Sequence, residues 1–153
     1  PGFGTVELRM CDATPTIREA CALAALAQCL VQWCDDEMDA GRALPETREW
    51  IRRENKWRAT RFGTEADLVI DNVGHTRLLH EVINQLVADL TPVAQRLECV
   101  SELNDVITIL EQGASYERQR SWLAQGATLE DIVARARREL LDDIATERVG
   151  SDS

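Results

Sequence analysis

The segment that organises this sequence comes first and reads Thr5-Val6-Glu7-Leu8-Arg9-Met10-Cys11-Asp12. Its residues alternate strictly, and because neighbouring side chains of a strand point to opposite faces, this pattern predicts a β-strand. One face would carry the apolar residues, and the other would carry Thr5, Glu7, Arg9 and Cys11. From the alternation alone we favour a plain interpretation, in which Glu7 and Arg9 form an ion pair on a solvated sheet face.

A single strand is not stable without further strands or a covering helix. The one other strand candidate in the sequence is weak and covers Asp67 to Asp71. The sequence also begins with Pro1 and enters the predicted strand almost at once. We therefore expect the chain to be the C-terminal part of a larger protein.

Composition predicts one soluble, globular domain, since the 153 residues are 44% hydrophobic and 29% charged. The longest apolar-rich segment, Ala20 to Cys34, is interrupted by two glutamines and predicts a buried helix, because a membrane span needs about 20 apolar residues. A net charge of −10 argues against nucleic-acid binding as the main function. The five cysteines include no C-x-x-C pair, which favours reduced thiols and a cytoplasmic protein. Two histidines at positions 75 and 80 make no His/Cys metal site.

The remainder of the sequence predicts helices. The first covers Ile17 to Met38 behind a Thr16/Glu19 capping box, and the second begins near Pro45 and ends before Gly63. A loop or short hairpin with a turn at residues 72–74 follows. Further helices are predicted at 77–90, after a new cap at 91–92 to about 98, and at 101–112, 116–125 and 129–147. The fold class is therefore predominantly α: an N-terminal strand (1–12), a helical region (16–147) of about six to seven helices, and a flexible tail (148–153).

The second predicted helix is the one locally basic segment of an acidic chain. Helical spacing places Asn55, Arg58 and Arg61 on the same broad side as three aromatic residues, Trp50, Trp57 and Phe62. Two arginines and an amide on an aromatic face favour an anion-binding cleft. The alternative is that the arginines extend past the tryptophans or pair with Glu54.

Two further groups have plainer interpretations. His80 lies beside an apolar stripe and is expected to be a hydrogen-bonded structural residue. The cluster Arg118-Gln119-Arg120 is expected to be solvated, although it follows a glycine-bounded loop and could reach toward a site.

The segments Gly4 to Asp12 and Glu54 to Gly63 resemble two motifs of the carboxylate–amine ligases, the type 2 glutamate–cysteine ligase family. The first is similar to the family pattern G-T-x-E-x-R-x-x-D, and the second is similar to N-x-W-x-A-x-R-x-G. The resemblance continues through the helices to the segment 113–119, and it corresponds to the C-terminal portion of the family.

This resemblance implies a part of an α+β fold of the glutamine-synthetase-like superfamily. It implies an enzyme that uses ATP and Mg²⁺ to join glutamate to cysteine or another amine through a γ-glutamyl phosphate. By analogy, Glu7 is a Mg²⁺ ligand, Arg9 is a catalytic residue, and Arg61, Arg58 and Asn55 bind substrate or phosphate. The expected partners are these small molecules, the remaining N-terminal portion of the same protein and further copies in a homo-oligomer, with no nucleic acid and no membrane. The 153 residues alone are expected to be inactive.

A second interpretation belongs to another class of protein: a helical assembly module without chemistry of its own. Its apolar helices after Arg77 would serve dimerisation, and Glu7 and Arg9 would be an ion pair at a sheet edge. A pure assembly module has no need for Arg58 and Arg61 on an aromatic face, so this pair distinguishes the two interpretations.

Overall fold

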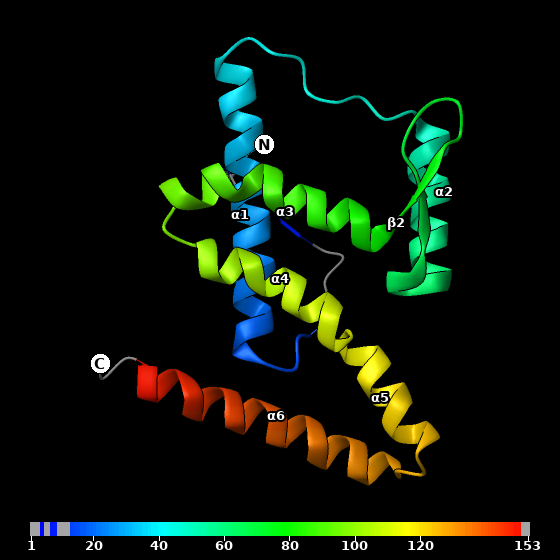
Figure 1. Cartoon of the computed structure of the whole chain (residues 1–153), viewed down its shortest axis with the longest axis vertical. Coiled ribbons are helices and arrows are strands. Elements are labelled where there is room, and N and C mark those ends of the chain that lie inside the picture. The colour runs from blue at the N-terminus through cyan, green and yellow to red at the C-terminus, as the bar shows by residue number, and fades with distance from the viewer. Residues whose placement is uncertain (1–3, 5–6, 9–12, 151–153) are drawn as a thin grey trace.

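The structure is a computed structural model that describes residues 4, 7–8 and 13–150, with side chains as far as 146. Helices dominate the described part of the chain, as predicted, and a two-stranded sheet accompanies them (Figure 1). In chain order the elements are α1 (Ile17–Asp39), α2 (Glu49–Phe62), the 3₁₀ turn η1 (Gly63–Glu65), β1 (Asp67–Val69), β2 (Thr76–Leu78), α3 (Leu79–Arg96), α4 (Val100–Gln112), α5 (Ser115–Ala124) and α6 (Leu129–Gly150).

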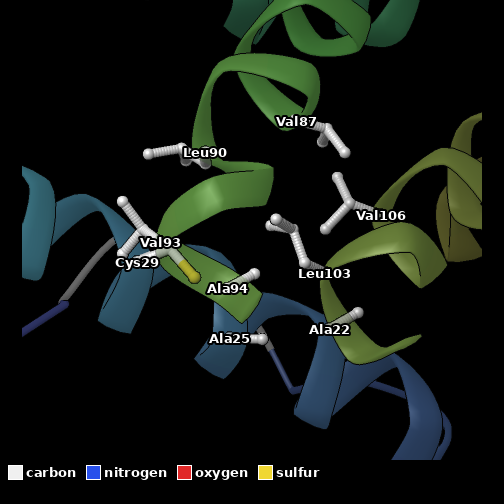
Figure 2. Close-up of a cluster of buried hydrophobic side chains, with 9 residues drawn as sticks. All are labelled: Ala22, Ala25, Cys29, Val87, Leu90, Val93, Ala94, Leu103 and Val106. Carbon is white, nitrogen blue, oxygen red and sulfur yellow. The ribbon is translucent and has the colours of Figure 1, made fainter. Parts of the chain in front are cut away.

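The core lies where α3 and α4 cross α1 (Figure 1). Helix α1 contributes small residues, which allow the three helices to approach closely, while α3 and α4 contribute larger apolar side chains. Leu90 and Leu103 are the largest fully buried side chains, each 1% exposed. Figure 2 shows the cluster, which consists of Ala22, Ala25, Cys29, Val87, Leu90, Val93, Ala94, Leu103 and Val106.

Helix α1 begins as predicted, because the Thr16 hydroxyl accepts a hydrogen bond from the Glu19 N–H at 3.1 Å. The Glu19 carboxylate binds Arg118 of α5. The side of α1 away from the core carries exposed apolar residues beside the exposed polar residues Gln28 and Asp35: Cys21 is exposed, and Val31 and Met38 are 47% and 58% exposed.

Helix α2 begins at Glu49, so the predicted start near Pro45 is wrong. A start at Pro45 would place Arg48 in the first turn, where the helix dipole disfavours a cation, whereas the observed start places Glu49 there. The residues between α1 and α2 form an exposed connection that spans the top of the molecule in Figure 1. The predicted end before Gly63 is correct.

The predicted hairpin is present and packs on α2. Strands β1 and β2 are antiparallel, with Leu68 opposite Arg77. The Asp71 carboxylate closes the turn by accepting hydrogen bonds from the backbone N–H groups of Val73, Gly74 and His75. The hydrogen bond from the His75 side chain, followed by these backbone bonds, lowers the pKa of Asp71 to about 2. The turn is therefore fastened by a carboxylate that stays charged well below neutral pH.

Helix α3 is continuous, so the predicted break at Thr91 and Pro92 is wrong. Proline removes one backbone donor, which normally ends or kinks a helix. Here Pro92 and Ala88, whose carbonyl loses its donor, are both exposed to solvent. The Thr91 hydroxyl also donates to the Val87 carbonyl at 2.9 Å. The helix therefore continues through Pro92, and water can bind the Ala88 carbonyl that has no backbone donor.

The two ends of the chain are described only in part. Glu7 and Leu8 lie in neither a helix nor a strand, and residues 5, 6 and 9–12 lie outside the described residues, so the remainder of the predicted strand is untested. Helix α6 runs to Gly150, three residues into the predicted tail, and residues 151–153 lie outside the described part. Across the helices that the structure describes, none combines the length and apolar character needed to cross a membrane.

Candidate functional site on helix α2

Asn55 holds the hairpin against α2. Its side-chain amide donates to the Val69 carbonyl at 2.9 Å, and its side-chain oxygen accepts from the Val69 N–H at 2.8 Å. The amide thus satisfies both backbone groups of the last residue of β1. In this structure Asn55 supports the site's framework, and its predicted role in substrate binding is untested.

Arg58 also contacts the hairpin. Its guanidinium pairs with Glu54 at 2.8 Å, one helical turn earlier, and donates to the Asp67 carbonyl at 3.0 Å. The pairing with Glu54 is the alternative that the sequence left open, and Arg58 no longer separates a ligase from an assembly module. Its role as a substrate ligand stays a prediction.

Arg61 lies on a different part of the helix surface. It is exposed, and no hydrogen bond or ion pair within the described residues involves it. By helical spacing it shares a stripe with Trp50 and Trp57, which are 44% and 57% exposed. Trp57 is fixed by an edge-to-face contact with Phe62, whose ring centre is 5.7 Å away. The sequence predicted one site from Asn55, Arg58 and Arg61. In the structure, Asn55 and Arg58 bond to the hairpin, whereas the Arg61 side chain is exposed.

The N-terminal site residues are only partly described. Glu7 is exposed to solvent, and Arg9 lies outside the described residues. Within the described ranges, no three His, Cys, Asp or Glu side chains come together as metal ligands. Glu7 is a hard oxygen donor of the kind that Mg²⁺ prefers, but one carboxylate is not a magnesium site. The described residues alone therefore do not fit the ion.

The C-terminal end of α2 is held by residues that the sequence analysis did not select. The Thr64 N–H donates to the Tyr116 hydroxyl at 3.1 Å, and the Thr64 hydroxyl donates to Glu117. Burial would raise the pKa of Glu117, but hydrogen bonds from Thr64, from the Ala114 N–H and from Tyr116 outweigh it and lower that pKa. Tyr116 and Glu117 lie within the 113–119 segment of the resemblance, which was the one available signal. Together they fix the turn that follows Arg61.

Arg118 is a largely covered junction between three helices, and the expectation that it is solvated is wrong. Its side chain is 17% exposed and pairs with Glu19 of α1 at 2.6 Å and with Glu139 of α6 at 3.2 Å. It also donates to the Gly113 carbonyl at 2.6 Å. Burial lowers the pKa of Arg118, but Glu19 and Glu139 outweigh it and raise that pKa above its ordinary value. Arg120, by contrast, is exposed and lies over the Tyr116 ring, 5.3 Å from its centre.

His80 also differs from its expectation. It lies in the first turn of α3, and its Nε2 atom is buried without a hydrogen-bond partner in the described part of the structure. The expected hydrogen-bonded role is therefore not met at this nitrogen. Glu117, which interacts electrostatically with His80, accepts its hydrogen bonds from Thr64 and Tyr116 instead.

Comparison with known families matches residues 1–139 to "Glutamate-cysteine ligase family 2(GCS2)". Similar proteins carry provisional names as glutamate–cysteine ligases. They include glutamate–cysteine ligase 2-1 of Frankia alni, 52% identical over 79% of this chain and 32% of the relative. They also include glutamate–cysteine ligase 2 of Thermobifida fusca, 47% identical over 87% of this chain and 33% of the relative, and that of Leifsonia xyli, 40% identical over 92% and 37%. The chain thus spans about a third of the length of these relatives. Since the family match covers most of its residues, the chain belongs to glutamate-cysteine ligase family 2.

Proposed function

We propose that this chain is the C-terminal part of an ATP-dependent carboxylate–amine ligase that joins glutamate to cysteine or another amine. In the proposed reaction the γ-carboxylate of glutamate attacks the terminal phosphorus of ATP, which releases ADP and forms γ-glutamyl phosphate. The amine then attacks the acyl carbon and displaces inorganic phosphate. The family match over residues 1–139, together with the exposed Arg61, is the observation that carries this proposal.

Arg61 is the residue of the described chain best suited to an anion in this reaction. A guanidinium offers a planar pair of donors that matches a phosphate or a carboxylate, and it stays charged at any physiological pH. Asn55 and Arg58 hold the hairpin on α2, and Tyr116 and Glu117 hold the turn after it. These contacts support a rigid placement for Arg61, which an electrostatic role in catalysis requires.

Glu7 and Arg9 complete the proposal on the N-terminal segment. Glu7 would give one carboxylate ligand to Mg²⁺, with the others coming from nucleotide phosphates and from the rest of the full-length ligase. Arg9 would contact the transferred phosphoryl group. Because the described residues do not make a magnesium site, we assign no step to the ion.

The remaining two thirds of the ligase is the proposed partner of this chain. The outer face of α1 carries three exposed apolar residues, Cys21, Val31 and Met38. A mainly apolar depression, which shares Val31 with this face, lies between Leu8, Val31 and Leu97. Covering these surfaces would bury apolar area that is unfavourable in water. Because the nucleotide site and the other metal ligands would lie in the rest of the ligase, we expect the 153 residues alone to release no phosphate in the presence of ATP, glutamate and amine.

The dimerisation module loses much of its support, because α3 and α4 place their apolar residues in the core with α1. The dimerisation interpretation needs the apolar faces of the helices after Arg77 to be exposed, and the apolar faces of α3 and α4 are instead buried against α1. In α6, Leu129 and Val133 are 75% and 69% exposed. They form a smaller apolar surface that could serve assembly. A homo-oligomer remains part of the proposal.

The test is an Arg61→Ala substitution in the full-length ligase, with phosphate release measured against glutamate, amine and ATP. We expect kcat/KM to fall by about 100-fold or more, as when a fixed donor is removed from a transition state. Arg61→Lys should recover part of the loss, since it keeps the charge without the fork. Lys56→Ala, at an exposed position of the same helix, is the matched control and should leave activity unchanged.

Activity in the Arg61→Ala enzyme equal to that of Lys56→Ala would remove Arg61 from the site. A parallel Glu7→Gln substitution with a Mg²⁺ titration tests the metal-ligand role. An unchanged metal dependence there would remove Glu7.

A further inference from the structure

Two cysteines that are distant in sequence meet in the core. The sulfur of Cys29 in α1 lies 3.7 Å from the sulfur of Cys99, which precedes α4. Seventy positions separate them along the chain. All four cysteines of the described part, these two with Cys21 and Cys34, are free thiols.

Both sulfurs are held in place by their surroundings. Cys29 is 0% exposed and lies within the core cluster, where Figure 2 shows its sulfur beside Val93 and Ala94. Cys99 is fixed by the reversal between α3 and α4: its N–H donates to the Ala94 carbonyl at 3.0 Å, and its carbonyl accepts from the Leu103 N–H at 3.0 Å. The residue before it, Glu98, adopts a left-handed backbone with φ of 55°. The two thiols therefore face each other because of the backbone path and the packing around it.

We propose that Cys29 and Cys99 form a site of reversible oxidation, at which a disulfide joins α1 to the turn between α3 and α4. A disulfide has a sulfur–sulfur distance of about 2.05 Å, so the atoms must approach by less than about 2 Å from their present 3.7 Å. The oxidant is a peroxide, and the reductant is a small dithiol. This inference does not depend on the proposed ligase activity.

The exposure of the two residues sets the order of the chemistry. Cys99 is partly exposed, whereas burial, together with the neighbouring Cys99, raises the pKa of Cys29 to about 11. The Cys99 thiolate attacks one oxygen of the peroxide, which breaks the O–O bond, leaves a sulfenic acid on Cys99 and releases hydroxide. The sulfur of Cys29 then attacks the sulfur of Cys99, and the hydroxyl group leaves with the Cys29 proton as water. Two thiols are oxidised in total, and one peroxide is reduced.

The disulfide would close a loop of 70 residues between two elements of the core. Closing a long loop reduces the conformational entropy of the unfolded chain and so stabilises the folded state. It would also prevent α1 from separating from α3 and α4, the helices that it contacts most. The oxidised chain should therefore unfold at a higher temperature than the reduced chain.

The experiment uses the full-length protein with every cysteine other than Cys29 and Cys99 replaced by serine, so that only this pair of thiols remains. The chain is treated with hydrogen peroxide, unfolded, alkylated and weighed by mass spectrometry. We expect a monomer that is lighter by two hydrogens, takes up no alkylating agent, melts at least about 5 °C higher, and returns to its starting state with dithiothreitol.

Two matched chains, in which Cys29 or Cys99 is also replaced by alanine, should show no such mass change and no rise in melting temperature. Alanine is chosen for Cys29 because it keeps the buried site small and apolar. A product that carries only sulfinic acid, or a disulfide that forms only between two chains, would overturn the proposal. Equal melting temperatures for the oxidised and reduced chains would also overturn it.

Discussion

Gly63, directly after α2, is the residue on which the local geometry depends most. Its backbone has φ of 60° and ψ of −132°, a combination that is essentially restricted to glycine. A side chain there would overlap the Tyr116 hydroxyl and would place its Cβ 2.7 Å from the ring carbon that bears it. Glycine therefore permits both the turn after Arg61 and the close contact with α5.

Gly63→Ala should destabilise the chain by about 2 kcal/mol or more, because it adds backbone strain and displaces Tyr116. The measurement is the free energy of unfolding in urea. Gly126→Ala is the matched control, since Gly126 has φ of 92° but no atom within 4 Å of its Cβ position. If both variants lost the same stability, the contact with Tyr116 would contribute nothing.

At the scale of elements, α2 and the hairpin form one unit through side-chain-to-backbone bonds. Asn55 contacts both backbone groups of Val69, and Arg58 contacts the carbonyl of Asp67, so two side chains of the helix position the first strand. Periodicity predicts the helix, and the turn residues at 72–74 predict the hairpin. Which face of the helix the hairpin covers depends on these hydrogen bonds between α2 and β1. Periodicity does not show such bonds, so it places Asn55 and Arg58 in one site with Arg61.

Asn55→Ala should cost about 2 kcal/mol, because it leaves the Val69 N–H and C=O without their partners while Val69 is only 5% exposed. Hydrogen exchange should also become faster at the Val69 amide. Asn84→Ala, at an exposed position of α3, is the control and should change stability by less than about 0.5 kcal/mol. Unchanged exchange at Val69 in the Asn55 variant would contradict the assigned role.

At the scale of the whole molecule, Arg118 connects elements that are far apart in sequence. It pairs with Glu19 at the start of α1 and with Glu139 in α6, and it belongs to α5 itself. Helix α6 passes below the lower end of α1 in Figure 1 and contacts α1 and α5. Arg118 is therefore one of the side chains that hold the last helix, together with Asp143, which accepts from the Arg18 N–H at 3.0 Å.

Arg118→Met should destabilise the chain by about 2 to 3 kcal/mol, because it leaves two partly buried carboxylates without their cation. The loss should be greatest in α6, where hydrogen exchange would report early opening. Arg42→Met is the matched control: its pair with Glu37 is on the surface, with Arg42 60% exposed, and should cost less than about 1 kcal/mol. Equal losses in the two variants would show that Arg118 is an ordinary surface cation.

The sequence by itself determined the fold class, the bounds of α1 to within one residue, the hairpin and the family resemblance. These follow from local patterns: apolar periodicity, the Thr16 cap, and the punctuation by Gly63 and by the turn at residues 72–74. It failed at Pro92, because a missing backbone donor matters little where the affected carbonyl is exposed, and exposure is not a local property of the sequence. It also failed at Arg118, because the two carboxylates that bury this charge are 99 and 21 positions away. Only the tertiary structure decided which charged side chains are used within the fold and which, like Arg61, remain available to a ligand, since that division depends on partners that meet only after folding.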